Sequence, residues 1–134
     1  MTKPVTNLND LIFVTTECGY VPQQSKPDKN RYVFFYTVTI HNNSSHDCQL
    51  LSRHWSIQDS NLKIEEVYGE GVIGEQPIIK PGDQYQYTSG SILETELGTM
   101  EGRYFMIHRS VDHEAIEFEI SIPKFTLSIP RTLH

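Results

Sequence analysis

The sequence predicts an all-β domain built as a two-sheet sandwich. Apolar residues recur at alternate positions in runs rich in Val, Ile, Phe, Tyr and Thr, a pattern typical of half-buried strands. Turn-forming residues separate these runs about every ten residues, and no stretch has the period of a helix. With 134 residues, of which 37% are hydrophobic and 21% charged, the chain has the size and composition of one globular domain. We expect a single domain over residues 1–134, ordered over roughly residues 11–130.

The first expected strand covers residues 11–16 and the second covers residues 31–41. In the second strand one face is apolar, formed by Tyr32, Phe34, Tyr36, Val38 and Ile40. Further strands are expected at residues 49–58, 63–67, 78–79, 84–88 and 103–108. Turn signals separate them at residues 42–45, 59–61, 81–83 and 111–113. Residues 89–91, where Gly90 lies between two serines, are also expected to turn.

The C-terminal part of the sequence alternates most clearly. In residues 115–122 every second residue is Ile or Phe, and the residues between them are Glu or Ser. Pro123 and Pro130 flank residues 124–129. Proline cannot donate a ladder hydrogen bond, so this last segment is expected to be a separate edge strand.

Charge and cysteine content limit the partners and the compartment. Eleven Lys and Arg against 17 Asp and Glu give a net charge of -6, which disfavours nucleic acid and anionic membranes as partners. No apolar run reaches the roughly 20 residues of a membrane span, and residues 1–10 lack the apolar core of a signal peptide. We expect a cytoplasmic protein in which Cys18 and Cys48 are packed as free thiols, although a single disulfide between them stays open in principle.

Six segments carry a resemblance to a known family: RYVF (31–34), LLSRHW (50–55), GEGVIGEQP (69–77), KPG (80–82), YTSG (87–90) and GTMEG (98–102). In this order and spacing they resemble the ApaG family over roughly residues 11–130. The resemblance implies a fibronectin type III-like or immunoglobulin-like sandwich, no known reaction, and a link to cobalt tolerance and magnesium efflux. Family members carry a short acidic, Gly-containing hairpin around residues 106–113. This chain departs from it, so a contact made by that hairpin is not carried over.

The glycine pattern is the first candidate binding site. Gly69, Gly71 and Gly74 form GxGxxG and are followed by Glu75, Gln76 and Pro77. A dinucleotide site would need a helix after the last glycine, whereas Pro77 and a strand follow here. A nest of backbone amides could still take a pyrophosphate, as in a diadenosine polyphosphate, but the neighbouring glutamates oppose it. We favour a tight bend with positive φ that crosses between the sheets and offers a surface for a partner.

Arg53, His54 and Trp55 are further candidates. In an unbroken strand Arg53 and Trp55 share a face with Leu51, whereas His54 shares the other face with Leu50. Arg53 then has to pair with a carboxylate, stack on Trp55 or reach the rim of the sheet, and we favour pairing. Trp55 is expected at the centre of the core, and His54 in solvent, where it could contact a partner.

No metal or catalytic centre is expected. His46 and Cys48 share strand parity and are weak candidates for cobalt or zinc, but no closed ligand set accompanies them. The sequence has no nucleophile motif, and Glu65 and Glu66 point to opposite faces of a strand. The sequence therefore predicts a non-enzymatic module without a cofactor that binds an unknown protein partner. A homodimer through exposed strand edges stays open, and a small anion or a divalent cation is less favoured.

Overall fold

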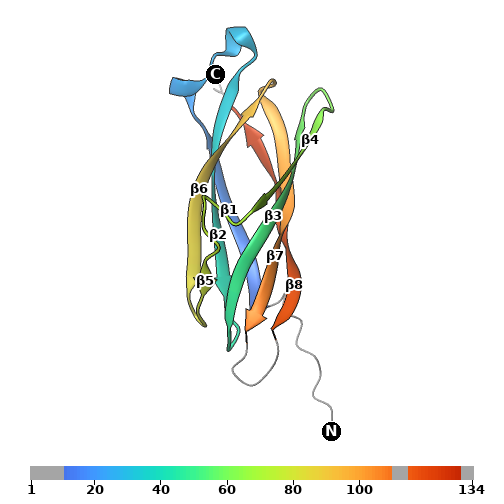
Figure 1. The fold of residues 1–134 in the computed structure, drawn as a ribbon. Helices are drawn as coiled ribbons and strands as arrows, with labels where there is room; N and C mark the ends of the chain where they lie inside the picture. The colour runs from blue at the N-terminus through green and yellow to red at the C-terminus, as the bar shows by residue number, and fades with distance from the viewer. Residues whose placement is uncertain (1–10, 110–114, 131–134) are drawn as a thin grey trace.

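The computed structural model describes residues 11–109 and 115–130, which form a sandwich of two antiparallel sheets (Figure 1). Its strands are β1 (Ile12–Tyr20), β2 (Tyr32–Asn42), β3 (Asp47–Asp59), β4 (Ile64–Glu70), β5 (Ile78–Ile79), β6 (Gln84–Leu93), β7 (Leu97–Arg109) and β8 (Ile116–Ser128). Two 3-10 turns, η1 (Pro22–Gln24) and η2 (Pro27–Lys29), follow β1. In the ranges given, no helix is long and apolar enough to cross a membrane. Residues 1–10 and the turn expected at 111–113 lie outside the described residues.

The smaller sheet has the order β1-β2-β6 and the larger one β4-β3-β7-β8. The short strand β5 pairs with the beginning of β3, and β4 pairs with its later part, so β4 and β5 lie end to end along one edge of β3. On one flank β1 approaches β8, where the Cys18 thiol lies 3.3 Å from the Thr126 carbonyl oxygen. The other flank is bordered by the edge strands β4 and β6.

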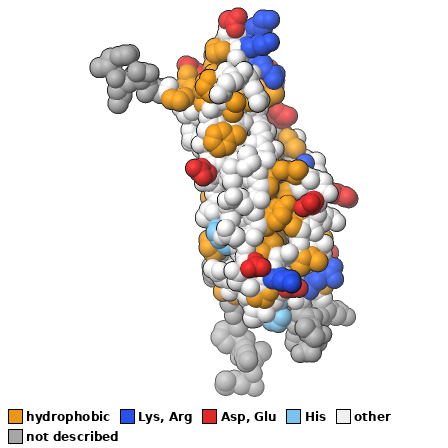
Figure 2. Space-filling view, turned by 90° about the vertical axis from the view of Figure 1, so that its left-hand side faces the viewer, with side chains coloured by type: hydrophobic (Ala, Val, Ile, Leu, Met, Phe, Trp, Pro, Cys, Tyr) orange, Lys and Arg blue, Asp and Glu red, His pale blue; other side chains and the backbone are white. Residues whose placement is uncertain are grey.

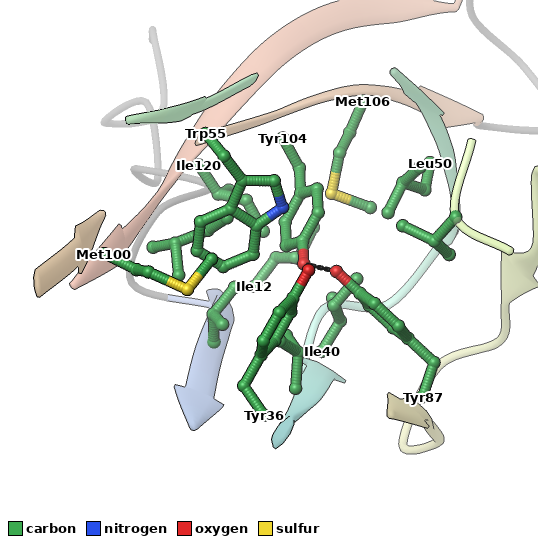
Figure 3. Close-up of a cluster of buried hydrophobic side chains, with 14 of the residues drawn as sticks. Ile12, Tyr36, Ile40, Leu50, Trp55, Tyr87, Met100, Tyr104, Met106 and Ile120 are labelled. Atoms are coloured by element: carbon green, nitrogen blue, oxygen red, sulfur yellow. Dashed lines mark hydrogen bonds between the residues drawn. The ribbon is translucent and has the colours of Figure 1, made fainter. Parts of the chain in front are cut away.

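The core lies between the sheets and is centred on Trp55, which is 2% exposed. Its indole meets Tyr36 and Phe125 edge-on, with ring centroids 5.2 and 5.9 Å apart. Tyr87 and Tyr104 share a hydrogen bond between their buried hydroxyls (Figure 3). Burial raises the pKa of both phenols, which are therefore neutral. The central position expected for Trp55 is confirmed, as is the inward face of β2.

A bulge divides β3 between Leu50 and Ser52. Before the bulge Cys48 and Leu50 are buried, and after it Trp55 is buried, because one extra residue exchanges the two faces of a strand. The expectation that Leu50 lies on the face opposite Trp55 is therefore wrong.

A second bulge lies in β8, where Met100 and Gly102 of β7 face Phe125 and Ile122. Ile120 and Ile122 point inward before the bulge, and Leu127 points inward after it. Pro123 is tolerated here because β8 is an edge strand and the bulge interrupts its ladder. The edge position expected for residues 124–129 is confirmed, but the expectation of a separate strand is wrong, since this segment continues β8.

Other strands are longer than their sequence patterns indicate. The strand expected to end at residue 88 continues as β6 to Leu93, with Ser89 and Ser91 on its inner face. The turn expected at residues 89–91 is therefore wrong. Small polar residues do not interrupt this strand, because β6 pairs with β2 over its whole length.

Candidate functional site

The glycine loop, residues 69–77, joins β4 to β5 and lies opposite the bulge in β3. The Gly71 amide donates to the Leu51 carbonyl at 2.8 Å, and the Leu50 amide donates to the Pro77 carbonyl at 3.1 Å. The Gln76 side chain also donates to the Leu51 carbonyl, at 2.9 Å. Both ends of the loop are thereby fixed to the same irregularity in β3. The expected crossing between the sheets is wrong for this loop, because the crossing occurs after β5, at residues 80–83.

The tip of the glycine loop is a two-residue hairpin. Val72 and Glu75 exchange backbone hydrogen bonds of 2.8 and 3.0 Å, and the residues between them have positive φ, 49° at Ile73 and 75° at Gly74. Such turns favour Asn-Gly, whereas a β-branched residue in the left-handed region is disfavoured by about 1–2 kcal/mol. Ile73 adopts this conformation and is 62% exposed. An unfavourable residue therefore displays an apolar side chain at the tip.

The three glycines serve different purposes. Gly71 has φ 61°, and a Cβ there would lie 2.1 Å from the Glu75 carbonyl oxygen. Gly74 has positive φ with open space around it. Gly69 has no positive φ, but a Cβ on it would lie 2.8 Å from the centre of the Arg53 guanidinium. Positive φ is confirmed at two positions, and at the third the glycine admits a side chain from β3.

Arg53 is held by peptide carbonyls. Its Nη1 donates to the Glu70 carbonyl at 3.2 Å and to the Gly71 carbonyl at 2.5 Å. Within the described part of the chain, no carboxylate comes within 4.0 Å of the guanidinium. The favoured pairing with a carboxylate is therefore wrong, because the end of β4 and the start of the glycine loop supply acceptors instead. Gly69 was identified by its pattern, but its contact with Arg53 has no signal in the sequence.

Three amides of the glycine loop are already used. Those of Gly71, Val72 and Glu75 all donate to protein carbonyls, and the Tyr85 hydroxyl donates to the Glu75 carboxylate at 3.1 Å. A pyrophosphate could take up these three amides only by opening the hairpin and separating it from β3. The geometry is that of an internally bonded bend that presents side chains outward.

His54 lies on the outer face of the larger sheet. Its Nε2 is hydrogen-bonded to the Glu66 carboxylate, and its ring stacks on Tyr68 with centroids 4.3 Å apart and planes 6° apart. The expectation of a solvated side chain is wrong in this respect. The cross-strand pairing of His54 with Tyr68 produces the stack, and Tyr68 itself is 70% exposed.

The weak metal candidates His46 and Cys48 both lie near His108. Cys48 is completely buried, and burial followed by the nearby Asp47 raises the pKa of its thiol to about 12. The His46 ring packs against His108, with centroids 5.0 Å apart. Across residues 11–109 and 115–130, no three side chains of His, Cys, Asp or Glu gather closely enough to hold an ion.

Comparison with known proteins identifies the family. The sequence model described as the ApaG domain matches residues 22–108. Protein ApaG of Pectobacterium atrosepticum is 51% identical over 123 residues, covering 92% of this chain and 95% of the relative, and that of Shewanella halifaxensis is 48% identical over 97% of this chain and its whole length. A crystal structure from Bordetella pertussis assigned as ApaA is 45% identical with a TM-score of 0.85, covering 90% of this chain and 95% of that one. The chain belongs to the ApaG domain family.

Proposed function

We propose that this protein is a cytoplasmic, non-enzymatic binding module that contacts another protein through the glycine loop and the neighbouring strand edges. The observation that carries the proposal is Ile73, an exposed β-branched residue at positive φ on a loop fixed at both ends. Local strain is typically retained where a site needs it. A loop held in this way loses little entropy when it binds, which favours recognition.

Further exposed apolar side chains lie on β4, β5 and β6. Ile78 and Ile92 are more than half exposed, as are Ile64 and Tyr68 on the edge strand β4. Figure 2 shows hydrophobic side chains gathered in a strip along one flank of the molecule with carboxylates beside them. A free strand edge flanked by apolar side chains suits a partner that adds a strand to the sheet. The glutamates of β4 and the loop favour basic residues in that partner.

The link to cobalt tolerance and magnesium efflux that the ApaG resemblance implies would then act through the partner. The complete burial of Cys48, which raises the pKa of its thiol, supports this route over an ion held by the module itself.

A matched pair of variants tests the proposal. Ile73→Asn removes the apolar side chain and puts a residue that tolerates positive φ into the turn. Leu62→Asn does the same at the other end of β4, where Leu62 has φ 64° and is 76% exposed. Both variants should raise the free energy of unfolding by about 1 kcal/mol in chemical denaturation, because both relieve backbone strain.

Only Ile73→Asn should weaken the partner complex. A photo-cross-linking residue placed at Gln76 would capture the partner in cell extract, and calorimetry with the purified pair would measure affinity. We expect Ile73→Asn to lower that affinity at least about tenfold, as loss of a buried apolar contact does. Equal affinity of both variants for the partner would contradict the proposal. So would cross-linking that captures only a second copy of this chain.

A further inference from the structure

A cavity of about 470 Å³ lies between the two sheets on the flank bordered by β4 and β6. Its lining comes from both sheets and from the glycine loop, with Trp55 and Tyr36 among the residues that reach it. This volume falls in the range of sites for small molecules, about 300–1,000 Å³. The cavity shares Ile73 and Ile92 with the protein-binding surface proposed above and extends from them between the two sheets.

Aromatic side chains form the inner wall of the cavity, among them Tyr36, Trp55 and Tyr87. Behind this wall the hydroxyls of Tyr36, Tyr87 and Tyr104 lie close together in the core, and the indole nitrogen of Trp55 lies on the side of its ring that faces them (Figure 3). The hydroxyls of Tyr87 and Tyr104 bond to each other. The Trp55 N-H is buried and has no acceptor within the described structure. A ligand in the cavity would therefore contact the face of the Trp55 ring and not its N-H.

Arg53 adds a positive charge to the same end. Only its Nη1 is bonded to the backbone, and no carboxylate in residues 11–109 or 115–130 pairs with it. The other end carries a negative charge. Glu65 lines the cavity, and Gly69 is the residue of β4 that pairs with Arg53. Four residues of strand separate Glu65 from Gly69, so the two ends of the cavity lie about 13 Å apart along β4.

The remaining walls consist of Ser89 and Ser91 on β6 and of apolar side chains, among them Val67, Val72, Ile73, Ile92 and Met100. The positive charge of Arg53 at the inner end, the largely apolar walls and the carboxylate of Glu65 at the far end together match a monoanion with an apolar body. A dianion such as phosphate would be incompletely neutralised by Arg53 and repelled by Glu65. We propose that this cavity binds a small apolar carboxylic acid, with its carboxylate at Arg53 and its hydrocarbon part over Trp55.

The only tryptophan of the chain lies in this cavity, which gives a direct readout. The probes are 3-phenylpropionate and 4-methylpentanoate, compared with their neutral carboxamides, the corresponding amines and inorganic phosphate. Titrations of the whole chain would follow the single indole N-H signal by NMR, with affinities from calorimetry. We expect the acids to move this signal and to bind at least about tenfold more tightly than their amides, since charge-assisted hydrogen bonds exceed neutral ones.

Substitutions locate the site. Ser89→Phe fills the cavity from the inner face of β6 and should abolish binding, whereas Thr88→Phe, on the exposed face where Thr88 bonds to Thr37, should leave it unchanged. Arg53→Gln should lower the affinity for the acids about ten- to hundredfold and leave that for the amides unchanged. Should Arg53→Gln not fold, Glu65→Gln serves instead and should tighten acid binding severalfold.

Three results would overturn the assignment: no movement of the indole signal at millimolar acid, equal affinities for acid and amide, or unchanged binding by Ser89→Phe. Tight binding of phosphate that competes with the acids would also overturn it. None of these outcomes depends on the protein partner, because the titrations contain this chain alone.

Discussion

At the scale of single residues, Gly71 and Gly74 differ in why a larger residue is disfavoured there. Gly71 has both a positive φ and the Glu75 carbonyl in the place of a Cβ, whereas Gly74 has only the positive φ. The sequence pattern marks the two residues equally. The difference arises from the hydrogen bonds between Val72 and Glu75, which bring the carbonyl over Gly71.

Alanine at these two positions should therefore have unequal effects. Gly74→Ala is expected to cost about 1 kcal/mol, the strain of a left-handed residue. Gly71→Ala is expected to cost about 2–4 kcal/mol, because the hairpin also has to open. Urea denaturation of both variants measures the two values, and equal losses would show that the carbonyl moves aside freely.

His108 gives a pH dependence to stability. Burial, with a smaller contribution from the His46 ring, lowers the pKa of His108 below its ordinary value of 6.5. The folded protein therefore favours the neutral ring, and the unfolded chain takes up the proton first as the pH falls. The stability contributed by this group is complete above pH 6.5 and is lost as the pH falls from there through the lower folded pKa.

His108→Gln removes this dependence. Between pH 7.5 and pH 5.5 the unmodified protein should lose more free energy of unfolding than the variant, as measured by denaturation at both pH values. The comparison cancels the contributions of other titrating groups, which are shared. An identical loss in both proteins would mean that His108 is protonated without leaving its packed position beside Ser44.

At the scale of elements, the bulge in β8 decides which residues reach the core. Residues 116–122 place even-numbered side chains inward, and after Pro123 and Lys124 the inward residues are odd-numbered. Deleting Lys124 should turn Phe125 and Leu127 toward solvent or shift the whole pairing with β7. We expect a loss of at least about 3 kcal/mol, the scale of removing a large buried side chain.

Lys124→Ala is the control for this deletion. It removes only an exposed ion pair with Glu101, 4.0 Å long, and should change the free energy of unfolding by less than about 1 kcal/mol. Thermal denaturation of the two variants compares them directly. A deletion as mild as the substitution would refute the role assigned to the bulge.

The two bulges also mark the limit of prediction from sequence at this scale. Alternation places every strand of the structure approximately, but it assumes that each strand keeps one parity. The apolar pattern changes parity at Leu51 in β3 and at Pro123-Lys124 in β8. In the sequence alone, such a change looks like either the end of a strand or a face of mixed polarity. The partner strand shows that each change is a bulge within one strand, because pairing with β7 continues on both sides of it.

At the scale of the whole molecule, the two-sheet architecture follows from the number and periodicity of the strands, as predicted. The cavity between β4 and β6 does not follow from them. It depends on which strands form the edges of each sheet, and strand order is set by contacts between distant segments. Arg53 and Trp55 were identified as a pair on one face, but their position at the end of a shared cavity needed the assembled sandwich.

The interleaved strand order has a consequence for synthesis of the chain. Residues 32–42 meet their second neighbour only at residues 84–93, and residues 47–59 meet theirs only at residues 97–109. A growing chain cannot complete the smaller sheet before residues 84–93 are made, nor the larger sheet before residues 97–109 are made. On the ribosome it therefore keeps apolar strand faces uncovered for most of its translation. Folding then begins late, and pausing of the ribosome before residue 97 would prolong the interval in which the unfinished chain is prone to aggregate.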